Sequence, residues 1–146
     1  MIQSDIKKIV EDLVQTFLDA GKISLDLRRK GLTKEIKSDN TPVSNGDLEV
    51  NKILTKKILS LTPNISIVSE EASENKTRDN LENFWLIDPI DGTYDYINDL
   101  DEFTINAGLI LDNKPVLGLI CAPAKKRMFF SYGKNLAFEF IGGETI

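Results

Sequence analysis

The first twenty residues place their apolar side chains three or four positions apart, with charged and polar residues between them. This spacing puts the apolar side chains on one face and predicts an amphipathic helix. Ser4 or Asp5 could cap its start, and the helix is predicted to continue toward Arg29 and to end before Gly31. The apolar stripe consists of Ile2, Ile6, Ile9, Leu13, Phe17 and Ala20.

A second helical pattern is predicted to open at Asp47 and to close at Thr62-Pro63-Asn64. Between the two helices, residues 31–46 are polar and rich in turn-forming residues, which predicts a loop or a short irregular hairpin. The apolar positions of the second helix are Val50, Ile53, Leu54 and Ile58.

Strand patterns begin after this helix. Residues 65–69 alternate between apolar and polar as a short strand does, and they end at the acidic pair Glu70-Glu71. Residues 72–82 are strongly polar and predict a mobile surface loop. Residues 84–87 form an apolar run with the aromatic and β-branched content of a buried strand, and the Pro-x-x-Gly that follows ends this run.

The last third of the chain predicts two hairpins. The first joins residues 104–111 to 116–121 through 112–115, and the second joins 126–132 to 135–141 around Gly133. Helices that come first and antiparallel strands that follow predict one α+β domain over residues 1–146, with two helices packed on an antiparallel sheet.

Composition and charge limit the function classes. The 146 residues are 41% hydrophobic and 28% charged, which is typical of a soluble globular domain. A net charge of −5 argues against a broad electrostatic interaction with nucleic acid polymers or anionic membranes. No stretch approaches the roughly 18 apolar residues that span a membrane. Because the N-terminus also lacks the unbroken apolar core of a signal peptide, we expect a cytoplasmic location.

The sequence contains no histidine, and Cys121 is its single cysteine. The absence of histidine excludes Ser-His-Asp and Cys-His nucleophilic schemes and histidine-ligated zinc. One cysteine cannot form an internal disulfide, and the apolar neighbours of Cys121 predict a buried thiol rather than a nucleophile. Carboxylates, hydroxyls and lysines remain for chemistry.

Carboxylates gather where predicted elements begin or end. Glu70-Glu71 follow one strand, Asp88 and Asp91 follow the next, and Asp47 stands at a helix start. Oxygen ligands without nitrogen or sulfur partners select Mg²⁺, Mn²⁺ or Ca²⁺ over zinc. Taken singly, each of these acids is better explained as a solvated surface residue or a helix N-cap than as a metal ligand.

The residues after Asp88 add groups that suit a bound anion. Ile90 can lend its main-chain carbonyl as a further oxygen ligand, Gly92 lets the backbone approach a ligand, and Thr93 adds a hydroxyl at the first turn of a helix. The N–H groups of a helix start favour a phosphate. The sequence therefore predicts a metal ion held next to a bound phosphate.

Two other groups of residues have simpler interpretations. We expect Tyr94, Tyr96 and Phe103 to be packing residues rather than a surface that stacks nucleic acid bases. We expect Lys125-Lys126-Arg127 to be a solvated turn rather than a phosphate clamp.

Three motifs resemble those of the inositol monophosphatase family, which comprises Mg²⁺-dependent, lithium-sensitive phosphatases. They are DNTPVSNGD at residues 39–47, VSEE at 68–71 and WLIDPIDGT at 85–93, in the family's order. Residues 102–106, 114–118 and 122–123 are most similar to the bacterial CysQ branch, whose members are 3'(2'),5'-bisphosphate nucleotidases. The resemblance implies removal of the 3'-phosphate from adenosine 3',5'-bisphosphate, a reaction of sulfur metabolism.

The resemblance also implies roles for individual residues. Glu70, Asp88, Asp91 and the Ile90 carbonyl would bind the metal, with two or three Mg²⁺ ions in a complete family member and Mn²⁺ as a substitute. Asp47 and Thr93, with Glu70, would orient and deprotonate the attacking water. Asp91 and the backbone of Gly92 and Thr93 would hold the phosphate.

The resemblance covers nearly all of this chain but only about the first half of a family member. The family's second signature, Trp-Asp-x-Ala, is not in the sequence, so we expect the C-terminal α/β domain of the sandwich to be absent. Gly46 replaces the alanine or threonine usual in the family, a change that we expect to be tolerated. The alternatives are an inositol monophosphatase or other sugar-phosphate phosphatase, or a non-catalytic fragment that self-associates through its uncovered sheet.

Overall fold

The computed structural model describes residues 3–69, 82–133, 136–141 and 144–145. The helices are α1 (Gln3–Lys30), α2 (Asn45–Leu61), α3 (Thr93–Ile97) and the 3₁₀ turn η2 (Pro123–Lys125). The strands are β1 (Lys34–Ile36), β2 (Pro42–Ser44), β3 (Ser66–Ser69), β4 (Phe84–Asp91), β5 (Thr104–Leu111), β6 (Lys114–Ala122), β7 (Arg127–Tyr132), β8 (Leu136–Ile141) and β9 (Glu144–Thr145).

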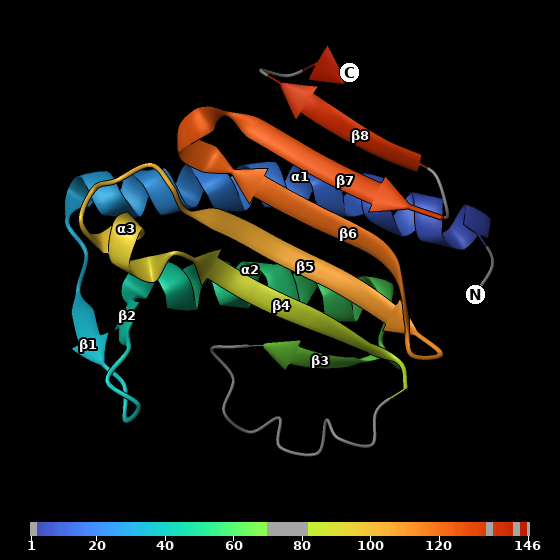
Figure 1. Ribbon diagram of the computed structural model, residues 1–146, viewed down its shortest axis with the longest axis horizontal. Helices are drawn as coiled ribbons and strands as arrows, with labels where there is room; N and C mark the ends of the chain where they lie inside the picture. The colour runs from blue at the N-terminus through green and yellow to red at the C-terminus, as the bar shows by residue number, and fades with distance from the viewer. Residues whose placement is uncertain (1–2, 70–81, 134–135, 142–143, 146) are drawn as a thin grey trace.

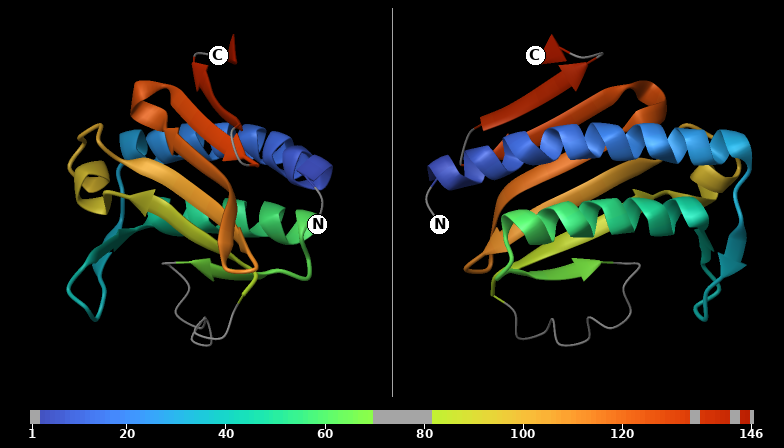
Figure 2. Two further views of the ribbon diagram at one scale, coloured as in Figure 1. Left: turned by 45° about the vertical axis from the view of Figure 1, so that its right-hand side comes forward. Right: turned by 180° about the vertical axis from the view of Figure 1, so that it is seen from behind.

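The molecule has two layers, a sheet and a pair of helices. The strand order of the sheet is β3-β4-β5-β6-β7-β8-β9. Figures 1 and 2 show α1 and α2 side by side on one face of this sheet, while the β1–β2 hairpin lies beside the end of α1. The arrangement confirms the α+β class, the two packed helices, and the short hairpin within residues 31–46.

The core forms where the apolar stripe of α1 meets the sheet. Leu13, Phe17 and Ala20 are completely buried, as the helical spacing predicts. Trp85 lies beneath α2, and its indole N–H donates a hydrogen bond of 3.0 Å to the Thr62 hydroxyl at the end of that helix. Because the indole carries the one polar group of a large apolar side chain, this bond allows its full burial.

The start of α1 differs from the prediction. The helix already includes Gln3, so Ser4 and Asp5 lie inside its first turn and neither is the N-cap. The spacing of apolar residues predicts which segment is helical but not the first residue of the helix. That residue depends on local hydrogen bonds, which the spacing does not reveal.

One strand pair of the sheet is parallel, whereas the prediction was an antiparallel sheet. β3 pairs with β4 in parallel, and every other neighbouring pair in the sheet is antiparallel. Residues 70–83 connect β3 to β4, and this length exceeds the dozen or so residues that a parallel connection requires. The predicted mobile loop over residues 72–82 lies outside the described residues except for Glu82.

β4 continues beyond the predicted end of its apolar run and includes Asp88 and Asp91. Its register against β5 shifts between these two residues. Pro89 falls in the shifted stretch, where its missing N–H removes no regular ladder bond. The two aspartates therefore lie in the irregular final part of strand β4 rather than after it.

The two predicted hairpins are confirmed, with a shorter turn in the first. Asp112 and Asn113 alone make that turn, with φ angles of 52° and 64°. Two left-handed residues are typical of a type I′ turn, which matches the twist of the flanking strands. Lys114 and Pro115 consequently belong to β6.

The face of the sheet opposite the helices is covered by no element among the described residues (Figure 2). Leu86 of β4 and Ile120 of β6 are 53% and 45% exposed on this face, whereas their neighbours Trp85 and Ile87 are buried under the helices. Among the described helices, none combines the length and the apolar character that a membrane span requires.

Cys121 and two of the three aromatic residues lie in the core as predicted. Burial raises the pKa of the Cys121 thiol to about 12, which makes it unreactive near neutral pH. The rings of Tyr96 and Phe103 pack with their centroids 4.8 Å apart. Tyr94 differs from the prediction, because it is 69% exposed on the outer side of the short helix α3.

Gly46 lies against the buried side chain of Tyr96, and this contact predicts a large loss of stability for Gly46→Ala. A Cβ at position 46 would lie 2.6 Å and 2.7 Å from ring carbons of Tyr96 and closer still to its hydroxyl. Because Tyr96 has no exposed surface, we expect the free energy of unfolding in urea to fall by about 3 kcal/mol. Gly118→Ala is the control, since its Cβ would make ordinary contacts at 3.6 Å.

A double-mutant cycle identifies the cause of that loss. Leucine at position 96 lacks the outer ring atoms, so Gly46→Ala should cost much less in a Tyr96→Leu background. An equal cost in both backgrounds would contradict the contact with Tyr96 as the cause. The contact also explains why position 46 carries glycine, since the absence of a side chain leaves room for the ring of Tyr96.

Candidate active site

Ser44 and Asp47 fix the start of α2. Asp47 does not open the helix as predicted, because Ser44 is the N-cap and Asp47 is the third helical residue. One Asp47 carboxylate oxygen accepts hydrogen bonds from the Ser44 backbone N–H, at 2.9 Å, and from the Ser44 hydroxyl. The Asp47 N–H donates in return to the Ser44 hydroxyl. This capping box follows from the spacing Ser44-x-x-Asp47, a signal that the sequence prediction overlooked.

The second oxygen of Asp47 faces a residue 46 positions further along the chain. The Thr93 hydroxyl donates to this oxygen at 2.7 Å and lies 3.2 Å from the Ile90 carbonyl. Asp47 is 0% exposed, whereas Thr93 is partly exposed, so the bond joins a buried carboxylate to a hydroxyl that solvent can reach. Because the contact with the Asp47 carboxylate is the shorter of the two, we infer that the single Thr93 hydroxyl proton is donated to Asp47, which leaves the lone pairs of the hydroxyl able to accept a hydrogen bond from a ligand.

Gly92 shapes the backbone between β4 and α3. Its φ angle is 89°, which only glycine adopts readily, and a Cβ there would lie 3.0 Å from the Glu102 carbonyl oxygen. Thr93 is the first residue of α3, as predicted. The turn thus places the Thr93 hydroxyl over Asp47 while the segment around Phe103 packs behind it.

The carboxylates of β4 lie on either side of Pro89 and Ile90. Asp88 is half-buried and Asp91 is exposed. Glu70 and Glu71 lie outside the described residues. Within the described part of the chain, no three acidic side chains are close enough together to hold a metal ion by themselves. Two carboxylates and the Ile90 carbonyl are nevertheless the oxygen donors that Mg²⁺ prefers, so the donor set fits this ion.

Tyr96 supports the site from behind through a hydrogen bond that the sequence prediction, which gave it only a packing role, did not foresee. The Tyr96 hydroxyl donates to the Ser24 carbonyl of α1 at 2.7 Å. Burial, and then the negative charge of Asp47, raise the pKa of Tyr96, so its hydroxyl remains protonated. No local pattern could have identified the bond to Ser24, which joins residues 72 positions apart.

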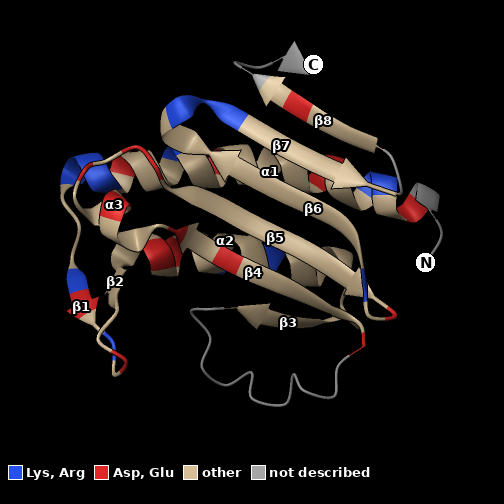
Figure 3. Ribbon diagram, viewed as in Figure 1, with Lys and Arg blue, Asp and Glu red and all other residues tan. Residues whose placement is uncertain are grey.

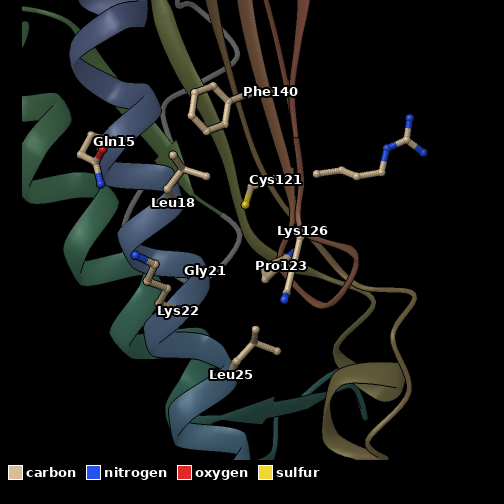
Figure 4. A pocket seen from close by; sticks show the side chains of 10 residues that line it. Gln15, Leu18, Gly21, Lys22, Leu25, Cys121, Pro123, Lys126 and Phe140 are labelled. Atoms are coloured by element: carbon tan, nitrogen blue, oxygen red, sulfur yellow. The ribbon is translucent and has the colours of Figure 1, made fainter. Parts of the chain in front are cut away.

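The basic residues 125–127 form a surface turn, as expected. Lys125 pairs with Glu102 at 2.8 Å and Arg127 pairs with Glu139 at 2.7 Å. Nearby, a groove of about 580 Å³ is lined by residues of α1, β6, η2 and β7 (Figure 4). Leu18, Pro123 and the sulfur of Cys121 line it, together with other residues, and none of the predicted site residues is among them.

The fold and this site define an α+β domain with acidic oxygen donors at the end of β4, the second strand of the sheet, beside a hydrogen-bonded aspartate–threonine pair. Comparison with known proteins identifies the family. The chain belongs to the inositol monophosphatase family, whose description matches residues 5–140.

Individual relatives define the similarity further. The 3'(2'),5'-bisphosphate nucleotidase CysQ of Aggregatibacter actinomycetemcomitans is 38% identical over 140 residues, which are 94% of this chain and 52% of the relative. The crystal structure of CysQ from Bacteroides thetaiotaomicron matches with a TM-score of 0.68 and 25% identity, over 97% of this chain and 50% of the other. An IMPase/NADP phosphatase complexed with Mg²⁺ and phosphate matches with a TM-score of 0.78 and 20% identity, over 94% and 51%. The chain spans about half the length of the curated relatives it matches.

Proposed function

We propose that the chain carries the water-activating part of a Mg²⁺-dependent phosphomonoesterase site. The observation that supports this proposal best is the 2.7 Å hydrogen bond from the Thr93 hydroxyl to Asp47. In the proposed reaction the attacking water gives a proton to the Thr93 hydroxyl oxygen while the Thr93 proton moves to Asp47. The same bond orients the Thr93 lone pairs before substrate arrives, so the water binds in an aligned position.

The residues proposed to hold the metal are Glu70, Asp88, Asp91 and the Ile90 carbonyl. When bound, Mg²⁺ would neutralise charge on the phosphate and make the attacking water more acidic. The backbone of Gly92 and Thr93, together with Asp91, would orient the phosphate. The Thr93 hydroxyl oxygen lies 3.2 Å from the Ile90 carbonyl oxygen and 2.7 Å from Asp47, and this proximity supports a place for the Ile90 carbonyl in the same site.

The proposed substrate is adenosine 3',5'-bisphosphate, hydrolysed to AMP and phosphate. The similarity to CysQ nucleotidases over 94% of this chain supports this choice. The alternatives are inositol monophosphate and fructose 1,6-bisphosphate, which other branches of the family would hydrolyse. We propose a cytoplasmic location.

We further propose that residues 1–146 form the metal-binding half of a two-part fold, and that a C-terminal α/β domain covers the open sheet face. Exposed Leu86 and Ile120 on that face support a covering partner. The remaining alternative is that the 146-residue chain self-associates through this face without catalytic activity. In that case the isolated chain would sediment as a dimer and release no phosphate.

A phosphate-release assay tests the proposed function. We expect the natural gene product in full to hydrolyse adenosine 3',5'-bisphosphate with Mg²⁺, and to lose this activity when EDTA removes the metal, because phosphate charge must be neutralised. The isolated 146-residue chain should show weak turnover or none. Faster hydrolysis of inositol 1-phosphate or fructose 1,6-bisphosphate would identify one of the alternatives, and equal rates with and without EDTA would contradict the metal mechanism.

A further inference from the structure

We propose that Arg28, at the end of α1, is a positioning residue that holds the Gly92–Thr93 turn in its active geometry. This inference rests on the proposed function for its catalytic consequence. The structural part stands on contacts of Arg28 alone and can be tested separately.

The Arg28 guanidinium makes three polar contacts with the segment that follows α3. It donates to the Leu100 carbonyl at 2.7 Å and forms ion pairs with Asp99 at 3.2 Å and Asp101 at 3.3 Å. The side chain is only 11% exposed, and its guanidinium carbon lies 5.1 Å from the centre of the Phe103 ring. A planar, five-donor group can make these contacts together, whereas a lysine ammonium cannot.

The segment that Arg28 holds is the one that packs behind Gly92. The Glu102 carbonyl oxygen and the Phe103 Cα lie 3.0 Å and 3.4 Å from the space that a Cβ of Gly92 would occupy. Gly92 precedes Thr93 directly, and the Thr93 hydroxyl bonds to Asp47. A continuous series of contacts therefore links Arg28 to the proposed water-activating pair.

A role at the helix end alone does not explain the position of Arg28. The last turn of α1 carries three cations, Arg28, Arg29 and Lys30, which all favour the negative end of the helix dipole (Figure 3). Arg29 is 75% exposed and pairs with Asp26 within the same helix. Arg28 instead turns inward, and four residues earlier the Ser24 carbonyl accepts the Tyr96 hydroxyl from α3. The same face of α1 thus supports the site turn at two points.

Hydrogen exchange measured by NMR, together with steady-state kinetics, tests the proposal in the full-length protein. The variant is Arg28→Met, which keeps the aliphatic packing, and the matched control is Arg29→Met. The reporters are the Tyr96, Asn98 and Leu100 amides, which donate at 2.9, 3.0 and 2.8 Å to carbonyls within residues 92–95. In Arg28→Met we expect these amides to exchange about tenfold faster, because α3 and the segment that follows it open more often.

The kinetic result separates positioning from simple packing. We expect kcat of Arg28→Met to fall by about tenfold to a hundredfold through loss of alignment, with KM changed less than about threefold. Arg28→Lys should recover part of kcat because it keeps the charge. If Arg28→Met does not fold, Asp101→Asn at the exposed end of the ion pair should shift exchange and kcat in the same direction.

Other outcomes would overturn the proposal. Exchange rates equal to those of Arg29→Met would contradict any hold of Arg28 on the turn. Faster exchange with unchanged kcat would limit Arg28 to loop stability and so overturn its positioning role. If the wild-type protein releases no phosphate from any of the three substrates, the proposed function fails, and the exchange comparison alone decides whether Arg28 holds the turn.

Discussion

Asp47→Asn should lower kcat for phosphate release by about a thousandfold while leaving the protein folded. The asparagine oxygen can still accept the Ser44 N–H, so the cap of α2 survives. Its NH₂ group must then face the Thr93 hydroxyl and donate to it, which reverses the hydrogen bond that Asp47 accepts. Thr93 would lose the group that takes its proton, and its oxygen could no longer accept one from water.

Kinetics and denaturation together check this result. Glu49→Gln is the matched control, because it removes an exposed carboxylate two residues further along α2. Thr93→Val removes the hydroxyl at nearly constant volume and should cost about as much as Asp47→Asn, and the double variant should cost little more, since the two residues act as a unit. Additive losses, or an Asp47→Asn enzyme within about tenfold of wild type, would contradict the proton path.

Local patterns in the sequence predicted most of the fold. The apolar period of α1 and the alternation of β5 to β8 are set by which face each element buries, and this information is contained within each segment. The start of α2 was misplaced by two residues because Asp47 also satisfies the preferences of an N-cap. The Ser44-x-x-Asp47 spacing, which is that of a capping box, indicates the correct start of the helix.

Local sequence patterns could not predict contacts between distant segments of the chain. The parallel pairing of β3 with β4 depends on how the intervening chain returns, which neither strand encodes. Arg28 and Tyr96 each meet a partner 72 positions away. In the sequence, Arg28 is one of several cations at a helix end, and only the folded chain distinguishes it from Arg29.

The proposed site likewise has one part that the structure describes and one part that stays a prediction. Resemblance to family motifs placed Asp47 and Thr93 in one site, and their hydrogen bond is in agreement with that placement. The metal-binding roles of Asp88, Asp91 and Glu70 remain predictions, because a metal site depends on donor geometry that a motif implies but does not measure. Substitution of a β4 aspartate is therefore the decisive test of the metal half.

Asp91→Asn should reduce Mg²⁺-dependent kcat/KM by about a thousandfold or more. Loss of a carboxylate ligand weakens the metal, and the metal is worth several kcal/mol of charge stabilisation in phosphate transfer, where each 1.4 kcal/mol is about tenfold in rate. Because Asp91 is exposed at the end of β4, the variant should fold with little change in stability. Asp88→Asn should cause a similar kinetic loss, with a larger effect on stability because Asp88 is half-buried.

Mn²⁺ binding followed by electron paramagnetic resonance gives a readout that does not depend on turnover. We expect Asp91→Asn to weaken Mn²⁺ binding at least about tenfold, since an amide lacks the charge that attracts the ion. Asp112→Asn is the matched control: it changes an exposed carboxylate at the opposite end of β5, and its left-handed backbone accepts asparagine. Wild-type activity and Mn²⁺ affinity in Asp91→Asn would remove this residue from the metal site, whereas lost activity with wild-type affinity would assign Asp91 to the phosphate instead.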